Sequence, residues 1–110
     1  MAPHALSIMV ERRGPWIAVL LSGELTYASQ ADLDQRLSGL AAQKQPRICI
    51  DLGGLAWCDS SGVACLLRGC RAAREHGGTL VLSRPSGIVN RMLVLLGATS
   101  ALTVIDELPA

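Results

Sequence analysis

Apolar and polar residues along the chain recur with two different periods. In residues 5–11 apolar side chains stand at alternate positions, the pattern of a half-buried strand. Arg12-Arg13-Gly14-Pro15 is typical of a turn, and the β-forming run Trp16–Ser22 follows it, ending at Gly23-Glu24-Leu25. These segments predict an antiparallel hairpin. The residues expected on the inner face of its first strand are Leu6, Ile8 and Val10.

Three later segments have helical spacing, in which apolar residues recur every three or four positions. The first begins after Ser29, which we expect to be its N-cap with Asp32 three residues on, and Pro46 stops it. The second opens at Asp59-Ser60-Ser61-Gly62 and closes at His76-Gly77-Gly78, where glycine suits a left-handed cap. The expected buried stripes are Leu33, Leu37 and Leu40 in the first helix, Val63, Leu66, Leu67, Cys70 and Ala73 in the second, and Val89, Met92, Leu93 and Leu96 in a third helix over residues 86–96.

The third helix carries more apolar residues than one stripe needs. Ile88, Val94 and Leu95 lie outside the stripe. We expect the C-terminal segment to cover most of them, and any that stay exposed would form a partner-facing patch.

The remaining apolar segments predict three more strands. Residues 47–52 form a nearly continuous apolar run, which suits a strand covered on both faces. Residues 79–83 and 102–105 are the other two, and residues 53–58 are interpreted as a loop that returns to the core. The order β-β-α-β-α-β-α-β predicts an α/β fold with a mixed, mostly parallel sheet of about five strands. Because parallel crossovers are right-handed, the helices should lie mainly on one side of the sheet.

Length and charge exclude several classes of protein. The 110 residues correspond to a single domain, residues 1–110. Lys+Arg 10 against Asp+Glu 9 gives a net charge of +1, which argues against direct binding to nucleic acid. The apolar runs are shorter than the ~20 residues of a membrane-spanning helix, and no signal peptide is evident at the N-terminus. We therefore expect a cytoplasmic protein without a membrane span.

The cysteines indicate neither a metal site nor a redox motif. None of Cys49, Cys58, Cys65 and Cys70 forms a C-x-x-C pair, so reduced and mostly buried thiols are expected. His4 and His76 are too few to complete a Cys/His cluster, and no metal or other cofactor is expected. Cys58 lies next to Asp59 and would tune that segment by oxidation if it were exposed, although an apolar anchoring role is favoured.

The segment Asp59-Ser60-Ser61-Gly62 allows two interpretations. The structural one is that Asp59 or Ser60 caps backbone N–H groups of the helix, which is worth ~1 kcal/mol. The functional one is that a serine is phosphorylated, because a helix N-terminus accommodates a group carrying about −1.5 to −2 charges. Gly62 would then leave the neighbouring hydroxyl unobstructed. A partner docked at this point would be repelled, which makes the segment a candidate charge switch.

The chain resembles STAS domains of the bacterial anti-sigma factor antagonist type. The resemblance covers nearly the whole chain, and it rests on the order and spacing of several motifs rather than on any one. The matching segments are Leu21-Ser22-Gly23-Glu24-Leu25, Ile48-Cys49-Ile50-Asp51-Leu52, Trp57-Cys58-Asp59-Ser60-Ser61-Gly62-Val63, His76-Gly77-Gly78-Thr79-Leu80 and 92–97.

This resemblance implies a function and a set of site residues. Ser61, the second serine of the pair, would be phosphorylated by an anti-sigma factor that is itself a serine kinase, with Asp59, Ser60 and Gly62 matching the family motif around it. The unmodified protein would bind the anti-sigma factor and release a sigma factor. Phosphorylation would end that binding, and a serine phosphatase would restore it.

One position departs from the family pattern. After glycine, Glu24 and leucine, many members carry an aspartate that contacts the partner, whereas this chain has Thr26. The change bears on the identity of the partner and on kinase recognition, and it leaves the acceptor serine in place.

Catalysis by this chain alone is not expected. Neither serine lies in a G-x-S-x-G nucleophile elbow, and the lone lysine, Lys44, does not follow the glycines of a phosphate-binding loop. His76 falls at the far end of the helix that begins near Ser61, roughly 20 Å away at 1.5 Å per residue. The alternative function is a STAS adaptor that is never phosphorylated, in a lipid-transport ATPase or a stress-sensing scaffold, and retention of the serine pair favours the switch.

Overall fold

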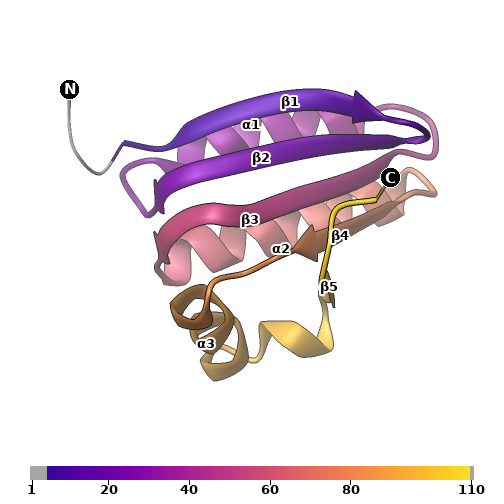
Figure 1. Ribbon diagram of the computed structural model, residues 1–110. Helices are drawn as coiled ribbons and strands as arrows, with labels where there is room; N and C mark the ends of the chain where they lie inside the picture. Colours follow the sequence, from indigo (N-terminus) through magenta and orange to yellow (C-terminus); the bar gives the residue numbers. More distant parts are fainter. Residues whose placement is uncertain (1–4, 110) are drawn as a thin grey trace.

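The computed structural model describes residues 5–109, which form one five-stranded sheet with helices packed against it (Figure 1). The strands lie in sequence order, with β1 antiparallel to β2 and all other neighbours parallel. The elements are β1 (Ser7–Arg13), β2 (Trp16–Leu25), α1 (Gln30–Ala41), β3 (Arg47–Cys58), α2 (Ser60–Glu75), β4 (Thr79–Ser83), α3 (Gly87–Leu95), the short 3-10 helix η1 (Ala98–Ser100) and β5 (Thr103–Ile105). The mixed, mostly parallel sheet predicted from the sequence is confirmed.

The core lies between one face of the sheet and the helices α1 and α2 (Figure 1). Leu33 and Leu37 of α1 are buried, and so are Val63 and Leu66 of α2. They pack against the alternate β3 residues Ile48, Ile50 and Leu52, none of which is exposed. Each such side chain contributes about 1.5–3 kcal/mol when it is removed from water. The predicted stripes of these two helices are confirmed, except that Leu40 and Leu67 are only half-buried.

The third strand is longer than the sequence suggested. Residues 53–58, interpreted above as a loop, continue β3 as far as Cys58. The reason is that β2 also runs on, so that Glu24 pairs with Trp57 and Leu25 with Cys58. The pairing is irregular near Gly54, where a Cβ would meet the carbonyl oxygen of Leu21 at 2.8 Å. Glycine is therefore required for the close approach of the two backbones.

The first turn of α1 also differs from expectation. Ser29 stands at the N-cap position, but its side chain caps no helical N–H group, so the capping pair with Asp32 is wrong. The helix ends at Ala41, several residues before Pro46, and a left-handed Gln45 turns the chain into β3. The end of α2 follows the prediction, because the N–H group of Gly78 donates to the carbonyl of Ala73 beside a left-handed Gly77.

The helix α3 lies at the end of the sheet and buries only a narrow face (Figure 1). Its N-cap Ser86 accepts a hydrogen bond from the N–H group of Val89 at 3.3 Å. Val89 and Leu93 are its only buried residues, whereas Leu96, expected in the core, is 45% exposed. The C-terminal segment leaves the other apolar residues uncovered, with Ile88 at 53%, Val94 at 57% and Leu95 at 70% exposed. The expectation that this segment would cover most of them is wrong.

Candidate functional site

Asp59 organises the segment that the sequence singled out. It is the N-cap of α2, and its Oδ1 accepts a hydrogen bond from the N–H group of Gly62 at 2.9 Å. Its Oδ2 accepts a second bond from the N–H group of Tyr27 at 3.1 Å, in the connection between β2 and α1. Its own N–H group donates to the carbonyl of Leu25 at 3.1 Å. One residue therefore holds the first turn of α2 against the end of β2.

The connection from β2 to α1 is held by Ser29. Its hydroxyl donates to the carbonyl of Glu24 at 2.8 Å and accepts from the N–H group of Thr26 at 2.9 Å. The carbonyl of Thr26 in turn accepts from the N–H group of Gln30 at 2.8 Å. Glu24 and Thr26 are half-buried here, while Tyr27 is 71% exposed. Glu24, Thr26 and Asp59 are thus brought together at one end of the sheet.

The two serines differ in exposure. Ser60 is exposed, whereas Ser61 is half-buried on the first turn of a helix of 16 residues. Within residues 5–109, neither hydroxyl makes a hydrogen bond. The cap is provided by Asp59, so the structural role first considered for the serines is already filled. Within residues 5–109 the fold therefore uses neither hydroxyl as a hydrogen-bonding group.

Gly62 is needed for packing rather than for access to the hydroxyl. A Cβ at this position would lie 2.5 Å from the carbonyl oxygen of Leu25 and 2.8 Å from the Sγ of Cys58. It would point into the core and away from solvent, because Gly62 itself is buried. The interpretation that Gly62 clears the approach to a neighbouring serine is wrong. The residue instead lets α2 start in direct contact with β2 and β3.

Cys58 is an apolar anchor. Its side chain is fully buried, and burial raises the pKa of its thiol to about 12. The sulfur donates a weak hydrogen bond to the carbonyl of Asp59 at 3.6 Å. A thiol that is neither exposed nor ionised is unreactive at neutral pH, so oxidation of Cys58 does not tune the segment. The expectation of buried cysteines is confirmed for all four.

An exposed polar link joins the amino end of α1 to the middle of α2. The Nε of Arg68 donates to Oδ1 of Asp34 at 3.0 Å, and its Nη2 donates to the side-chain carbonyl of Gln30 at 2.8 Å. The side chains of Arg68 and Asp34 are 45% and 44% exposed, so this ion pair contributes little to stability.

A second polar cluster was not found from the sequence. Asp51 is only 3% exposed, and its carboxylate accepts two hydrogen bonds from Arg84, to Oδ1 at 3.0 Å and to Oδ2 at 2.6 Å. Ser83 and the N–H group of Gly53 also donate to Oδ1. The hydrogen bonds from Arg84 hold the pKa of Asp51 below its usual range. The signal in the sequence was a lone acidic residue inside an apolar strand.

Potential metal ligands, and the pair Ser61 and His76, stay apart within residues 5–109. Among the residues that the structure describes, no three His, Cys, Asp or Glu side chains are grouped as metal ligands. His4 lies outside that part of the chain, and His76 is the C-cap of α2, where its ring nitrogen lies 3.0 Å from the carbonyl of Ala72. Ser61 and His76 therefore stand at opposite ends of one helix. No described helix is both long enough and apolar enough to span a membrane.

Comparison with known proteins places the fold. A family model described as "Mlab, STAS domain" matches residues 8–105. No curated protein matches the sequence.

Several solved structures are similar. An anti-sigma factor antagonist from Mycobacterium paratuberculosis is 21% identical with a TM-score of 0.86, and the match covers 97% of this chain and 91% of that one. The anti-sigma factor antagonist SpoIIAA in its unphosphorylated form is 22% identical with a TM-score of 0.75, over 92% and 90% of the two chains. The Bacillus cell fate determinant SpoIIAA in its phosphorylated form is 21% identical with a TM-score of 0.68, and the match covers 92% of this chain and 93% of that one.

Proposed function

Because the chain belongs to the STAS domain family, we propose that it acts as an anti-sigma factor antagonist whose binding is controlled at Ser61. The unphosphorylated protein binds an anti-sigma factor that is a serine kinase, and a sigma factor is released. Transfer of a phosphoryl group from the kinase's nucleotide to the Ser61 hydroxyl ends the binding, and a serine phosphatase restores it. The proposal gives the chain no catalytic role and a cytoplasmic location.

The observation that carries the proposal is the state of the Ser61 hydroxyl. Ser61 is half-buried as a residue, its hydroxyl has no hydrogen-bond partner within residues 5–109, and it stands on the first turn of a long helix. The similar SpoIIAA structures, which are described in an unphosphorylated and a phosphorylated form, support the choice of modification.

A phosphate at Ser61 would change the surface more than the fold. The helix N-terminus stabilises negative charge, and the cap at Asp59 stays in place because it uses Gly62 and Tyr27 rather than Ser61. The added charge lies beside the Asp59 carboxylate, two residues away along the chain. A partner surface that had excluded water there would face an unpaired dianion, which is costly to bury.

The test is capture of partners from the source cell with the unmodified chain as bait, followed by intact-mass measurement of the recovered bait. We expect a protein with a histidine-kinase-like nucleotide fold to be captured, and nucleotide to convert the bait to a singly phosphorylated form. Ser60→Ala serves as the matched control, because it removes the neighbouring hydroxyl and leaves the acceptor. Phosphorylation that persists in Ser61→Ala would refute the site.

A second candidate is a STAS adaptor that is not phosphorylated, within a lipid-transport ATPase or a stress-sensing scaffold. The description of the matching family model names no anti-sigma factor, and it is compatible with this role. Capture of a transport ATPase by the same bait, with no change in the mass of the bait, would select it over the first proposal.

A further inference from the structure

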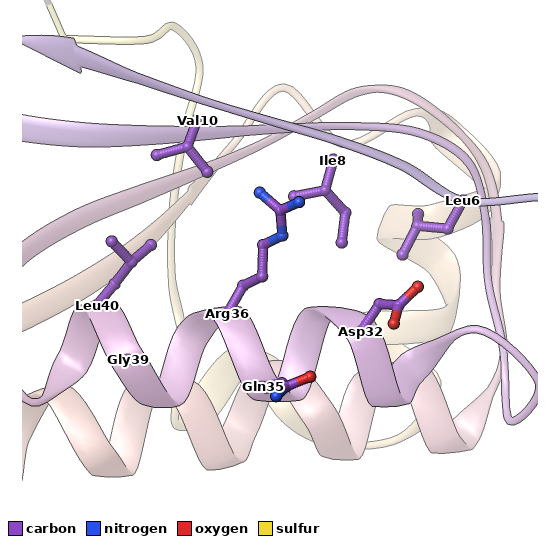
Figure 2. A pocket seen from close by; sticks show the side chains of 8 residues that line it. All are labelled: Leu6, Ile8, Val10, Asp32, Gln35, Arg36, Gly39 and Leu40. Carbon is purple, nitrogen blue, oxygen red and sulfur yellow. The ribbon is translucent and has the colours of Figure 1, made fainter.

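A groove of about 730 Å³ runs between β1 and α1 and opens at the edge of the sheet (Figure 2). Its apolar lining comes from Leu6, which directly precedes β1, from Ile8 and Val10 of β1, and from Leu40 of α1. Asp32 and Arg36 add charge along α1. Figure 2 shows the guanidinium of Arg36 reaching from the helix toward β1. Within residues 5–109, Arg36 and Asp32 make no ion pair. The groove therefore combines an apolar lining with two charged side chains, Asp32 and Arg36, that have no ion-pair partner within residues 5–109.

The strand above this groove is an open edge. Among residues 5–109, β1 pairs only with β2, and its seven residues leave the outer backbone groups without a strand partner. Met9 is 61% exposed and Val10 is 39% exposed on this edge. The opposite edge, β5, has only three residues. A long edge strand with exposed apolar side chains is a template for pairing with another strand.

We propose that β1 of a second copy of the chain pairs antiparallel with this edge, on a two-fold axis through Met9, to form a homodimer with a continuous ten-stranded sheet. In this register Ile8 faces Val10 of the second copy, and Met9 faces its own counterpart. The inner side chains of each copy then cover the groove of the other. This inference does not depend on the proposed function.

The axis is assigned by charge. Directly opposed residues in an antiparallel pair share a face, so the axis must pass through a residue. An axis at Glu11 or at Arg12 would place like charges against each other, and one at Val10 would place Arg12 opposite Ile8, beside which Figure 2 shows the guanidinium of Arg36. With the axis at Met9, by contrast, Ser7 faces Glu11 and Leu6 faces Arg12, and no like charges meet.

The same register supplies a partner for Asp32. Leu6 and Asp32 lie together at one end of the groove in Figure 2. Because Arg12 of the second copy stands opposite Leu6 and alternation places it on the inner face, its guanidinium is brought to the Asp32 carboxylate. Arg12 makes no ion pair within its own chain among residues 5–109. The two-fold axis forms this pair twice.

Sedimentation equilibrium of the full chain, from micromolar to millimolar concentration, tests the proposal. We expect a reversible dimer. Val10→Lys changes an exposed side chain of the monomer, and it should raise the dimer dissociation constant by roughly 100-fold because an ammonium group would be buried without a partner. Arg12→Asp and Asp32→Arg should each weaken the dimer by roughly tenfold, and the double variant should restore it.

Substitutions at two glycines distinguish loss of the dimer interface from loss of the fold. A Cβ at Gly39, which lines the groove, or at Gly87 of α3 would meet nothing within 4 Å, so both sites accept a side chain in the monomer. Gly39→Gln should weaken the dimer and Gly87→Gln should not, with unchanged circular dichroism for both. A wild-type chain that stays monomeric up to millimolar concentration would overturn the proposal. The open edge of β1 would then be assigned to a strand of another protein. A dimer unaffected by Val10→Lys or not restored by the charge swap would overturn the interface.

Discussion

The N–H group of Tyr27 donates to Oδ2 of Asp59 across 32 positions of sequence, at 3.1 Å. The other oxygen of the same carboxylate caps α2 through Gly62. The end of β2 and the start of α2 are therefore joined by one side chain. The two bonds can be separated by mutation, because an asparagine keeps one acceptor oxygen and replaces the other with an NH₂ group.

Asp59→Asn should keep the helix cap and lose the bond to Tyr27, whereas Asp59→Ala should lose both. We expect the alanine variant to cost about 1 kcal/mol more in the free energy of unfolding than the asparagine variant, the usual value of an N-cap. Hydrogen exchange measures each bond directly. The Tyr27 amide should exchange faster in both variants and the Gly62 amide only in Asp59→Ala. Unchanged protection of Tyr27 in Asp59→Asn would contradict the bridging role.

Gly62→Ala should destabilise the chain by about 1–3 kcal/mol, because the new methyl group must displace the backbone carbonyl of Leu25. Gly39→Ala is the matched control, since it adds the same methyl group to a helix with nothing within 4 Å. The control should gain up to about 1 kcal/mol from helix propensity. Urea denaturation of both variants measures the contrast, and equal changes of the same sign would show that Gly62 is not tightly packed.

Ser61→Ala should bind the anti-sigma factor like the unmodified chain and accept no phosphate. Ser61→Asp should weaken that binding by roughly 2–5 kcal/mol, as expected for a charge buried without a partner at an interface. Its melting temperature should stay close to that of the wild type, because the added charge lies at a helix N-terminus. Titration calorimetry gives the affinities, and Ser60→Asp controls for charge on the same turn. Equal affinities of Ser61→Ala and Ser61→Asp would remove the switch.

The Asp51–Arg84 cluster should make the free energy of unfolding depend on pH in the acidic range. Because the folded-state pKa of Asp51 is lowered, its contribution is present above the unfolded pKa of about 3.8 and is lost as pH falls through the folded value. In Arg84→Gln the main cause of the lowered pKa is gone, so the folded and unfolded pKa values lie closer together and less stability should be lost as the pH falls. Urea denaturation over a pH series measures this. Arg68→Gln, which breaks an exposed pair, should leave the profile unchanged.

The cysteines should resist thiol reagents in the folded protein. Burial raises the pKa of Cys58 to about 12 and that of Cys65 to about 11, so almost no thiolate is present at neutral pH. Labelling with an aromatic disulfide should be slow until urea unfolds the chain, and then all four thiols should react. Ser60→Cys, at an exposed position, supplies a fast-reacting reference. Native labelling of Cys58 at the rate of that reference would contradict its burial.

The sequence predicted the parts of this fold that a local pattern determines. Leu33 and Leu37 repeat at the helical period, and Gly77 marks the end of α2, so these features could be read without coordinates. Strand β3 could not be delimited in the same way, because residues 53–58 are extended only through pairing with a partner strand. Tertiary contacts of this kind override local turn signals such as Gly53-Gly54.

The residues of the candidate site were proposed from the sequence, whereas the contacts that they make could not be predicted from it. Asp59, Ser60 and Ser61 could be identified from their order, yet the role of Gly62 depends on Leu25, which only the fold brings to it. The bonds between Arg84 and Asp51 are hidden for the same reason, since the two residues are 33 positions apart. The exposed face of α3 was missed because apolar composition does not reveal which side of a short helix meets the sheet.

Between the last residue of β3 and the first residue of α2 stands only Asp59. Because no flexible linker separates the two elements, a phosphate added to the first turn of α2 cannot be accommodated by movement of a hinge at this junction. Spectroscopic measures of shape should then register almost nothing on modification. Phosphorylation should instead shorten the lifetime of the complex with the partner. The dissociation rate constant of that complex is therefore the quantity to measure.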